Sequence, residues 1–391
     1  MTRQPPPEPH SWDGMVVLAS GMSWDDAWMS EKHLAIALAR LAPVLFVDPA
    51  VSWLTPLRKP QLSRAPMSGG LHMVAPGVAR VTPVAPPGVS RPLLRHAAYA
   101  ATRAAIRQSV AELGGRVSAI VAASLDPVLD ACRAEMRVLY ATDDWVSGAA
   151  LMGLRTAWLE RRLSEQLARA DVVVAVSPTL AAKWSPQAHR VTVVPNGCDT
   201  AAFASTDATA PASDVHLAAP IAGFIGHMSA RIDLSILEAV ADSGSSVLLV
   251  GPRQLTFDPR RLDSLLAREN VQWTGPRAFA DLPSYMRHIK VGLTPYAETP
   301  FNRSSFPLKT MEYLAAGRTA VVTDLPAARM LPEELVIRAS GPTDFARVTA
   351  QELLRERDPE LEHRRRAYAE TNSWAVRAAE FAQAIGLQVH P

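Results

Sequence analysis

The sequence has very little cysteine, no long apolar run and almost no net charge, and each of these absences excludes a class of protein. Cys132 and Cys198 are the only cysteines in 391 residues, too few for a disulfide framework or a cysteine-rich zinc site. No apolar run approaches the roughly 20 residues of a membrane span. The formal net charge is +2, and aromatic residues are not interleaved with basic ones, so we expect no nucleic-acid partner.

The first residues also lack the pattern of a signal peptide, because MTRQPPPEPHSWDG is polar and rich in proline. Hydrophobic residues make up 48% of the chain and charged residues 20%, which is typical of globular proteins. We therefore predict a cytoplasmic protein with a disordered tail over residues 1–14 and enough length for two domains.

Acidic residues are absent between Asp48 and Glu112, although basic residues are frequent there. The basic residues are Arg58, Lys59, Arg64, Arg80, Arg91, Arg95, Arg103 and Arg107. A helix predicted over Arg91–Arg107 can hold an anionic surface, such as the inner face of a membrane that carries a lipid-linked acceptor. The alternative is a solvated basic face balanced by acids elsewhere.

Short continuous apolar runs alternate with amphipathic segments, which is typical of parallel sheets covered by helices on both faces. The predicted strands are 15–20, 44–48, 118–123, 137–142, 171–177 and 190–195, then 221–226, 246–251, 271–275, 291–296 and 319–324. This pattern predicts an α/β fold of two Rossmann-like doubly wound domains facing a central cleft. No GxGxxG motif follows either first strand, so no nicotinamide or flavin site is predicted.

Residues 201–220 separate the two sets of strands and are rich in Ala, Ser, Thr and Pro, with little amphipathic period. We predict an interdomain linker there. The N-terminal domain is then 15–200 and the C-terminal domain 221–372.

The most informative segment is FNRSSFPLKTMEYLAAG (301–317), which we predict to be a loop leading into a helix with Pro307 in its first turn. Lys309 and Glu312 are three residues apart, so they lie on neighbouring parts of one helix face. Helix amides and a lysine can bind phosphate while a carboxylate accepts hydrogen bonds from sugar hydroxyls. This combination suits a nucleotide sugar; the alternative is a surface ion pair.

Several ordered motifs support one family resemblance from about Met15 to Leu387. They are YATDDW (140–145), VVPNGCDTAAF (193–203), GFIGHMSARID (223–233), LLVGP (248–252), GPRAFADLPSYM (275–286), the segment 291–317 and TDLPAAR (323–329). The chain resembles GT-B glycosyltransferases of the glycosyltransferase-4-like superfamily, nearest to the bacterial branch similar to teichuronic acid biosynthesis glycosyltransferases.

The resemblance implies an enzyme that moves a sugar from a nucleotide-sugar donor to a glycan or lipid-linked acceptor in cell-envelope or exopolysaccharide synthesis. It implies retention of anomeric configuration, no metal and no other cofactor. It also implies that the C-terminal helix, 373–391, packs back on the N-terminal domain. The arginine run Arg364–Arg366 before this helix is predicted to be solvated. Two alternatives stay open: a sugar-nucleotide epimerase of the same fold, and a nucleotide-sugar-binding protein without turnover.

The resemblance also assigns donor-site roles by position. Glu312 takes the place of the glutamate that binds the donor ribose, and Lys309 and Arg231 take the places of cations that clamp the diphosphate. Losing either cation predicts a roughly 10- to 100-fold loss of activity. Further donor-site candidates are Gly226 and His227 at the phosphates, and Gly251, Pro252, Pro276 and Arg277 near the nucleobase.

At one position the chain departs from many relatives, which carry a sugar-contacting glutamate where this sequence has Ser304. Glu298, Asn302 or Arg303 are the candidates that replace it.

The acceptor side is predicted at the ends of two N-terminal strands. Candidate acceptor-binding residues are Gly21, Trp24, Asp25 and Asp26, which follow the first strand. Asp143 and Asp144 follow another strand, where one of them can orient the acceptor hydroxyl or act as a base. The alternative is that one of this pair caps the next helix.

Overall fold

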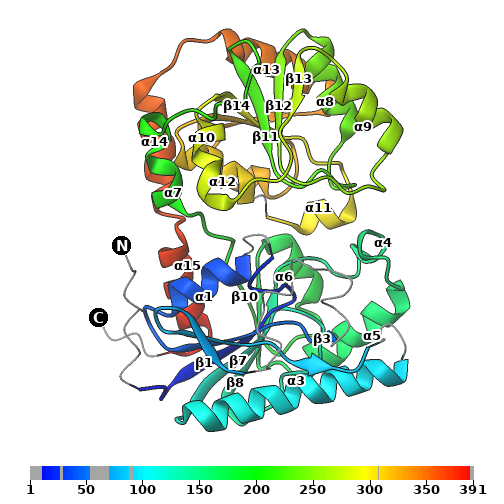
Figure 1. Ribbon diagram of the computed structural model, residues 1–391, viewed down its shortest axis with the longest axis vertical. Helices are drawn as coiled ribbons and strands as arrows, with labels where there is room; N and C mark the ends of the chain where they lie inside the picture. The colour runs from blue at the N-terminus through cyan, green and yellow to red at the C-terminus, as the bar shows by residue number, and fades with distance from the viewer. Residues whose placement is uncertain (1–10, 27–29, 53–69, 88–91, 307, 388–391) are drawn as a thin grey trace. The chain divides into compact units, whose positions relative to one another are not determined.

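The structure is a computed structural model that describes residues 11–26, 30–52, 70–87, 92–306 and 308–387 (Figure 1). The chain divides into two compact units. Unit 1 contains the residues up to Pro195 together with those from Trp374 onward, and unit 2 is Asn196–Ser373. Each unit has its own sheet of mainly parallel strands.

The sheet of unit 1 has eight strands in the order β10-β9-β8-β7-β1-β2-β5-β4. Its strands are β1 (Met15–Ala19), β2 (Val44–Val47), β4 (His72–Ala75), β5 (Val78–Val81), β7 (Val117–Ala122), β8 (Ala134–Ala141), β9 (Val172–Ala175) and β10 (Val191–Val193). Neighbours pair in parallel except β4 with β5, and a separate parallel pair joins β3 (Val51–Ser52) to β6 (Val84–Ala85). The six N-terminal strands predicted from apolar runs all lie in this sheet, because continuous burial on both faces requires such runs.

The helices of unit 1 cover this sheet (Figure 1). They are α1 (Ser30–Leu38), α3 (Pro92–Leu113), α4 (Ala149–Met152), α5 (Thr156–Leu167), α6 (Pro178–Trp184) and α15 (Trp374–Ala384). The C-terminal helix α15 belongs to this unit, where Trp374 stacks on His33 with ring centroids 5.5 Å apart and Phe381 meets the ring edge of Tyr140 at 5.2 Å.

The sheet of unit 2 has six parallel strands in the order β13-β12-β11-β14-β15-β16. They are β11 (Ile221–Ile225), β12 (Ser246–Val250), β13 (Val271–Trp273), β14 (Ile289–Thr294), β15 (Thr319–Thr323) and β16 (Val336–Ala339). Only β16 was not predicted from the sequence. Because the order reverses at β11, the loops after β11 and β14 leave the sheet side by side, which is where open α/β sheets bind ligands.

Helices of unit 2 pack against this sheet, some of them in a shared hydrophobic core. The helical elements are α7 (Thr200–Ala204), η2 (Thr206–Ala208), α8 (Leu234–Asp242), α9 (Pro259–Leu266), η3 (Phe279–Asp281), α10 (Leu282–Met286), α11 (Pro300–Ser304), α12 (Leu308–Ala315), η4 (Ala328–Met330), α13 (Gly341–Leu354) and α14 (Pro359–Glu370). Alternate strand residues such as Phe224 and Leu249 pack with Leu237 of α8 and Phe345 of α13 in that core.

Helix α12 approaches the sheet closely because of a glycine in β14. A Cβ on Gly292 would lie 2.3 Å from the ring of Tyr313 on α12. The Tyr313 hydroxyl accepts a hydrogen bond from the amide of Ile225 and lies 3.2 Å from the carbonyl oxygens of Gly223 and Leu293. This contact fixes α12, which carries Lys309 and Glu312, relative to the ends of β11 and β14.

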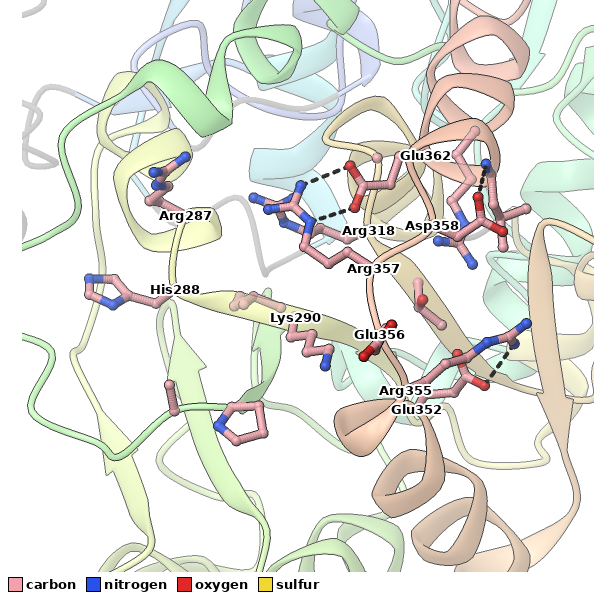
Figure 2. Close-up of a pocket in the computed structure, with 17 residues that line it drawn as sticks. Arg287, His288, Lys290, Arg318, Glu352, Arg355, Glu356, Arg357, Asp358 and Glu362 are labelled. Carbon is pink, nitrogen blue, oxygen red and sulfur yellow. Dashed lines mark hydrogen bonds and ion pairs between the residues drawn. The ribbon is translucent and has the colours of Figure 1, made fainter.

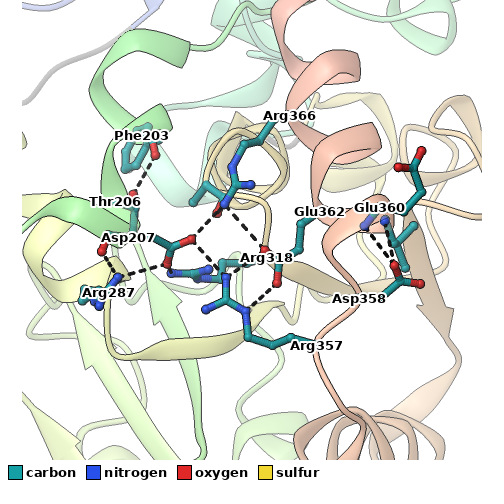
Figure 3. Close-up of polar contacts among 12 residues, drawn as sticks. Phe203, Thr206, Asp207, Arg287, Arg318, Arg357, Asp358, Glu360, Glu362 and Arg366 are labelled. Atoms are coloured by element: carbon teal, nitrogen blue, oxygen red, sulfur yellow. Dashed lines mark hydrogen bonds and ion pairs between the residues drawn. The ribbon is translucent and has the colours of Figure 1, made fainter.

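The predicted linker, 201–220, differs in the structure. Its first residues form α7 and η2 and belong to unit 2. Asp207 of η2 receives ion pairs from Arg287, Arg318, Arg357 and Arg366 (Figure 3). The segment is therefore anchored by these ion pairs and by the fully buried ring of Phe203 in α7, and a single apolar anchor gives no amphipathic period that would reveal a helix.

The prediction that Arg364–Arg366 is a solvated run is wrong for two of its residues. Arg365 is only 5% exposed. The Arg366 guanidinium lies 2.9 Å from a carboxylate oxygen of Asp207 and donates to the carbonyl of Ala316. Folding of α14 against α7 buries this face, and no pattern within the run indicates it.

Replacing Asp207 by asparagine is expected to destabilise unit 2 by about 2 kcal/mol at pH 7. This is below the roughly 3–5 kcal/mol of a fully buried pair, because a third of the side chain reaches solvent. Burial acts to raise the pKa of Asp207, but hydrogen bonds and charge from Arg318 and Arg357 outweigh it, so the pKa is lowered. The stabilisation is therefore complete above the unfolded pKa of about 3.9 and is lost as the pH falls below it.

Urea unfolding of wild type and Asp207→Asn at pH 7 and pH 3 tests this. The matched control is Asp242→Asn, whose exposed carboxylate pairs with Arg268 and should change stability little. A difference between wild type and Asp207→Asn that does not shrink at low pH would contradict the role of the ion pairs.

Candidate active site

The carboxyl ends of β11 and β12 meet at two glycines. The Gly226 amide donates to Val250 O at 2.8 Å, and the Gly251 amide donates to Gly275 O at 2.9 Å. A Cβ on Gly251, whose φ is +131°, would lie 2.1 Å from Gly226 O. The two loops thus approach at backbone contact, which only glycine allows. Pro252 also connects the loops after β11 and β12, because its carbonyl accepts a hydrogen bond from the Met228 amide at 2.9 Å.

Arg231 follows the β11 loop and is held in place by a buried asparagine. Asn302 Oδ1 accepts from Arg231 Nε at 3.3 Å, and Asn302 Nδ2 donates to Arg231 O at 2.7 Å and to Ala297 O at 2.8 Å. The guanidinium carbon lies 4.9 Å from the Phe301 ring centroid and 5.3 Å from that of Tyr296. No carboxylate in the described part of unit 2 lies within ion-pair distance of Arg231, so its charge is available to an anion.

His227 lies in the same electrostatic environment. Burial lowers the pKa of His227, and the positive charge of Arg231 lowers it further. The imidazole is therefore mainly neutral at pH 7 and can offer phosphate a neutral N–H.

Lys309 and Glu312 form an ion pair on α12. Lys309 Nζ lies 3.0 Å from each carboxylate oxygen of Glu312. Glu312 is 3% exposed, so the alternative interpretation, a surface ion pair, does not describe it. Burial raises the pKa of Glu312, the charge of Lys309 lowers it, and the nearby Asp199 raises it. Burying a carboxylate without a partner is costly, and the ion pair with Lys309 offsets this cost.

The segment 196–199 of unit 2 lies beside this pair. Burial raises the pKa of Cys198, and the charge of Glu312 acts in the same direction. The Cys198 amide donates to Asn372 O at 3.0 Å, and Asp199 caps α7 by accepting from the Ala202 amide. The segment 196–199 and the helix α12 are therefore neighbours within unit 2.

The residues predicted to replace the sugar-contacting glutamate have different environments. Ser304 is buried at the end of α11. Asn302 is occupied in holding Arg231. Glu298 and Arg303 are exposed and pair with each other at 3.6 Å.

The structure brings the backbone of the predicted nucleobase residues together, because the Gly251 amide donates to the carbonyl of Gly275, the residue before Pro276. Arg277 pairs with Asp214 at 2.5 Å and lies over the ring of Tyr285 at 5.3 Å. Pro276 is exposed beside it. Gly251 and Pro252 belong to the glycine contact described above, whereas Arg277 is held by a partner outside it.

In unit 1, the predicted acceptor loop after β1 is tied to the sheet. Asp48 Oδ1 accepts from the Trp24 amide at 2.9 Å, and Asp48 Oδ2 accepts from Arg80 Nε at 2.7 Å. Arg80 pairs with Asp25 at 2.7 Å, and Asp26 accepts from the Ser23 amide.

Trp24 packs into the unit 1 core. It is 8% exposed and meets Phe46 edge to face at 5.0 Å. Its indole therefore supports the loop instead of presenting a surface for a sugar. Gly21 precedes it, and a Cβ there would lie 3.2 Å from Ala123 O. Asp25 and Asp26 of this loop are both exposed, and the side chain of Asp25 is 41% exposed.

Asp143 and Asp144 follow β8, and their surroundings differ. Asp144 is buried and accepts from the Ser147 amide at 3.1 Å, from Ser147 Oγ at 2.7 Å and from Lys183 Nζ at 2.6 Å. It therefore closes the turn before α4 and is not the helix cap of the alternative interpretation, because the N-cap of α4 is Gly148. Asp143 is half-buried, and its charge contributes to raising the pKa of the buried Glu31, after burial itself, to about 7.

Sequence reasoning missed the positioning role of Asn302 and of Tyr313, and missed Glu31 altogether. The signal for the first is the run TPYAETPF before Asn302, in which two aromatic residues flank the Arg231 guanidinium. Nothing local marks Glu31, whose burial in α1 depends on the fold of unit 1.

Neither a metal centre nor a membrane span is found in the described part of the chain. Its His, Cys, Asp and Glu side chains form no group of three or more that could hold a metal ion. None of its helices is both long enough and apolar enough to cross a membrane. Independence from metal stays a prediction.

Residues 219–354 match the family model described as glycosyl transferases group 1. A putative teichuronic acid biosynthesis glycosyltransferase of Bacillus subtilis (strain 168), TuaH, is 31% identical over 175 residues. That match covers 44% of this chain and 44% of the relative, so it spans less than half the length of either. The predicted family resemblance is confirmed over these matched regions.

Solved structures show the fold. Sucrose-phosphate synthase from Thermosynechococcus elongatus superposes with a TM-score of 0.72 at 16% identity, over 94% of this chain and 97% of that one. Anabaena HepE in complex with UDP-glucose superposes with a TM-score of 0.64 at 15% identity, over 96% of this chain and 100% of that one. These neighbours are GT-B proteins, so the predicted α/β GT-B fold is confirmed.

Proposed function

We propose that this chain, which carries a group 1 glycosyltransferase domain over residues 219–354, is a glycosyltransferase that moves a sugar from a nucleotide-sugar donor to a glycan or lipid-linked acceptor. The observation that carries the proposal is the ion pair on α12 between the half-buried Lys309 and the buried Glu312. The name of the Bacillus subtilis relative supports a role in polysaccharide synthesis, and the UDP-glucose bound to HepE supports a nucleotide-sugar donor.

The roles follow from charge and burial. Breaking the anomeric bond puts negative charge on the β-phosphate, and cations that are already in place stabilise that charge most in the transition state. Arg231 is oriented by Asn302, and Lys309 is oriented by Glu312. When the donor binds, the Lys309 ammonium bridges to phosphate while the Glu312 carboxylate accepts hydrogen bonds from the ribose hydroxyls.

The finer parts of the proposal concern stereochemistry and the acceptor. We expect retention of anomeric configuration and no metal requirement, as in the family that the motifs resemble. Asp25, Asp26 and Asp143 are the acceptor-side candidates in unit 1.

Contact with an anionic membrane surface would use α3, on which Arg107 is exposed. Arg95 of that helix lies over the Trp158 ring at 4.5 Å, Arg80 is buried in the Asp48 ion pair, and Arg58, Lys59, Arg64 and Arg91 lie outside the described residues, as does Pro307.

Calorimetric titration of UDP, GDP, dTDP and ADP into wild type and Glu312→Ala tests the donor site. We expect one nucleotide to bind with micromolar affinity and the substitution to weaken it at least tenfold, because ribose hydroxyls lose a carboxylate partner. Glu333→Ala is the matched control, since Glu333 is 86% exposed and pairs with Arg338 on the surface.

Failure of every nucleotide to bind would overturn the donor-site assignment. If a nucleotide binds, sugar release that requires an acceptor supports transfer, whereas isomerised or hydrolysed donor without an acceptor would support the epimerase. Neither comparison favours the epimerase or an inactive binding protein.

A further inference from the structure

A second polar pocket lies in unit 2 at the opposite edge of the sheet from the candidate active site. Its lining includes Pro220 before β11, Ile289 at the start of β14 and Thr319 at the start of β15. These are the amino ends of strands whose carboxyl ends hold Gly226 and the loop before α11. The remaining wall comes from the end of α13, the segment 355–358 and the first turns of α14 (Figure 2). The pocket is therefore separate from the proposed donor site.

Cationic side chains outnumber carboxylates around this pocket. The cations are Arg287, Lys290, Arg318, Arg355, Arg357 and Arg365, and the carboxylates are Glu352, Glu356, Asp358 and Glu362. Part of this charge is neutralised, since Arg355 pairs with Glu352 and Arg357 pairs with Glu362.

Two of the cations have no carboxylate partner. Arg365 is 5% exposed, and its hydrogen bond is from Nε to Leu335 O at 3.2 Å. Lys290 Nζ donates to Leu353 O at 2.7 Å. No carboxylate of the described residues lies within 4.0 Å of either group. Burying a guanidinium without a counter-ion is costly, and burial accordingly lowers the pKa of Arg365.

A third cation, Arg318, is also incompletely satisfied. It is 5% exposed, and its Nη2 donates to Asp207 at 2.5 Å, but its buried Nε has no hydrogen-bond partner among the residues that the structure describes. Asp207 is shared among Arg318, Arg357, Arg366 and Arg287. One carboxylate cannot neutralise four guanidinium groups, so this wall of the pocket keeps a positive excess even with Glu362 included.

We propose that this pocket binds a small phosphate-bearing anion. A phosphate dianion would supply the missing counter-charge for Arg365 and Lys290 and would accept from guanidinium groups in the paired geometry that phosphate and arginine favour. The described residues that line the pocket include no Phe, Tyr or Trp, so nothing there offers a nucleobase an aromatic stacking surface. The ligand is therefore inorganic phosphate or a small phosphomonoester, not a nucleotide.

Phosphate binding to the full chain tests this proposal. The probes are inorganic phosphate and glycerol 3-phosphate, titrated by calorimetry at constant ionic strength, with sodium chloride as the reference salt. The variants are Lys290→Gln and Arg365→Lys. The second keeps the positive charge but removes the planar guanidinium, which can bind phosphate through two N–H groups at once. Lys309→Gln is the matched control, because it removes a cation from the donor site and leaves this pocket intact. Thermal unfolding confirms that each variant is folded.

The expected result is saturable binding of at least one probe to wild type and to Lys309→Gln, weakened about tenfold or more by Lys290→Gln. Tighter binding of glycerol 3-phosphate than of inorganic phosphate would identify a phosphomonoester as the ligand, and the reverse would identify free phosphate. Absence of saturable binding, equal effects of chloride, or loss in Lys309→Gln but not in Lys290→Gln would overturn the proposal.

Nucleotide titrations of the same variants separate this inference from the proposed function. Lys290→Gln should bind the donor nucleotide as wild type does. A chain that binds phosphate through Lys290 but binds no nucleotide would overturn only the donor-site assignment.

Discussion

Replacing Lys309 by glutamine is expected to lower kcat/KM for sugar transfer about 10- to 100-fold. The amide keeps much of the length of the side chain but loses the charge, and a charge-assisted hydrogen bond is worth roughly 1.5–3 kcal/mol. The loss should fall mainly on kcat, because the charge on the β-phosphate develops in the transition state. Initial rates with the nucleotide sugar identified by calorimetry measure it.

Two further variants make this result specific. Lys309→Arg keeps a cation next to Glu312 and should recover part of the activity. Arg347→Gln removes an exposed cation that pairs with Asp344 on α13 and should leave kcat/KM unchanged. Wild-type activity in a folded Lys309→Gln protein would exclude Lys309 from the reaction.

The same pair shows what spacing predicts and what it leaves open. The i,i+3 spacing places Lys309 and Glu312 on one helix face, and the structure joins them at 3.0 Å. Spacing cannot tell a surface pair from a buried one, because the surroundings of Glu312 include Cys198 and Asp199, which lie more than 100 residues earlier in the chain. The burial of this carboxylate is therefore set by the fold of unit 2 and not by the local sequence.

The strands were predictable because each is a continuous apolar run covered on both faces. Elements without such a run were not: β3, β6 and β16 are short or partly exposed, β4 is only partly buried, and the apolar run of the buried strand β5 is interrupted by Arg80. The sequence predicts a linker for the segment with Asp207 because the residues that pair with it are distributed over the rest of unit 2: Arg287, Arg318, Arg357 and Arg366.

Residue type and local position predicted the exposure of two side chains incorrectly. Trp24 was predicted to contact the acceptor because it follows a strand end, but it packs against Phe46 beneath the loop. Arg365 was predicted to be solvated because it stands in a run of arginines, but it is buried at the wall of the second pocket. Such positions are decided by long-range packing, which composition and period do not encode.

Replacing Gly251 by alanine is expected to destabilise unit 2 by about 3–5 kcal/mol and to abolish nucleotide binding. The φ of +131° is strained for any residue with a Cβ. The added Cβ would also lie 2.1 Å from Gly226 O, a backbone atom that cannot rotate away. Relief requires the β11 and β12 loops to separate, which would break the hydrogen bond from the Gly251 amide to Gly275 O and displace Gly226 from the phosphate position.

Gly244→Ala separates the two causes. Gly244 has a φ of +81°, but no atom lies within 4 Å of the position its Cβ would take. Its substitution should therefore show the strain alone, about 1–2 kcal/mol, with nucleotide affinity unchanged. Urea unfolding and calorimetry of the two variants measure the difference. Equal destabilisation would mean that the loops yield without cost, and that the close contact between Gly226 and Gly251 does not hold the phosphate site in shape.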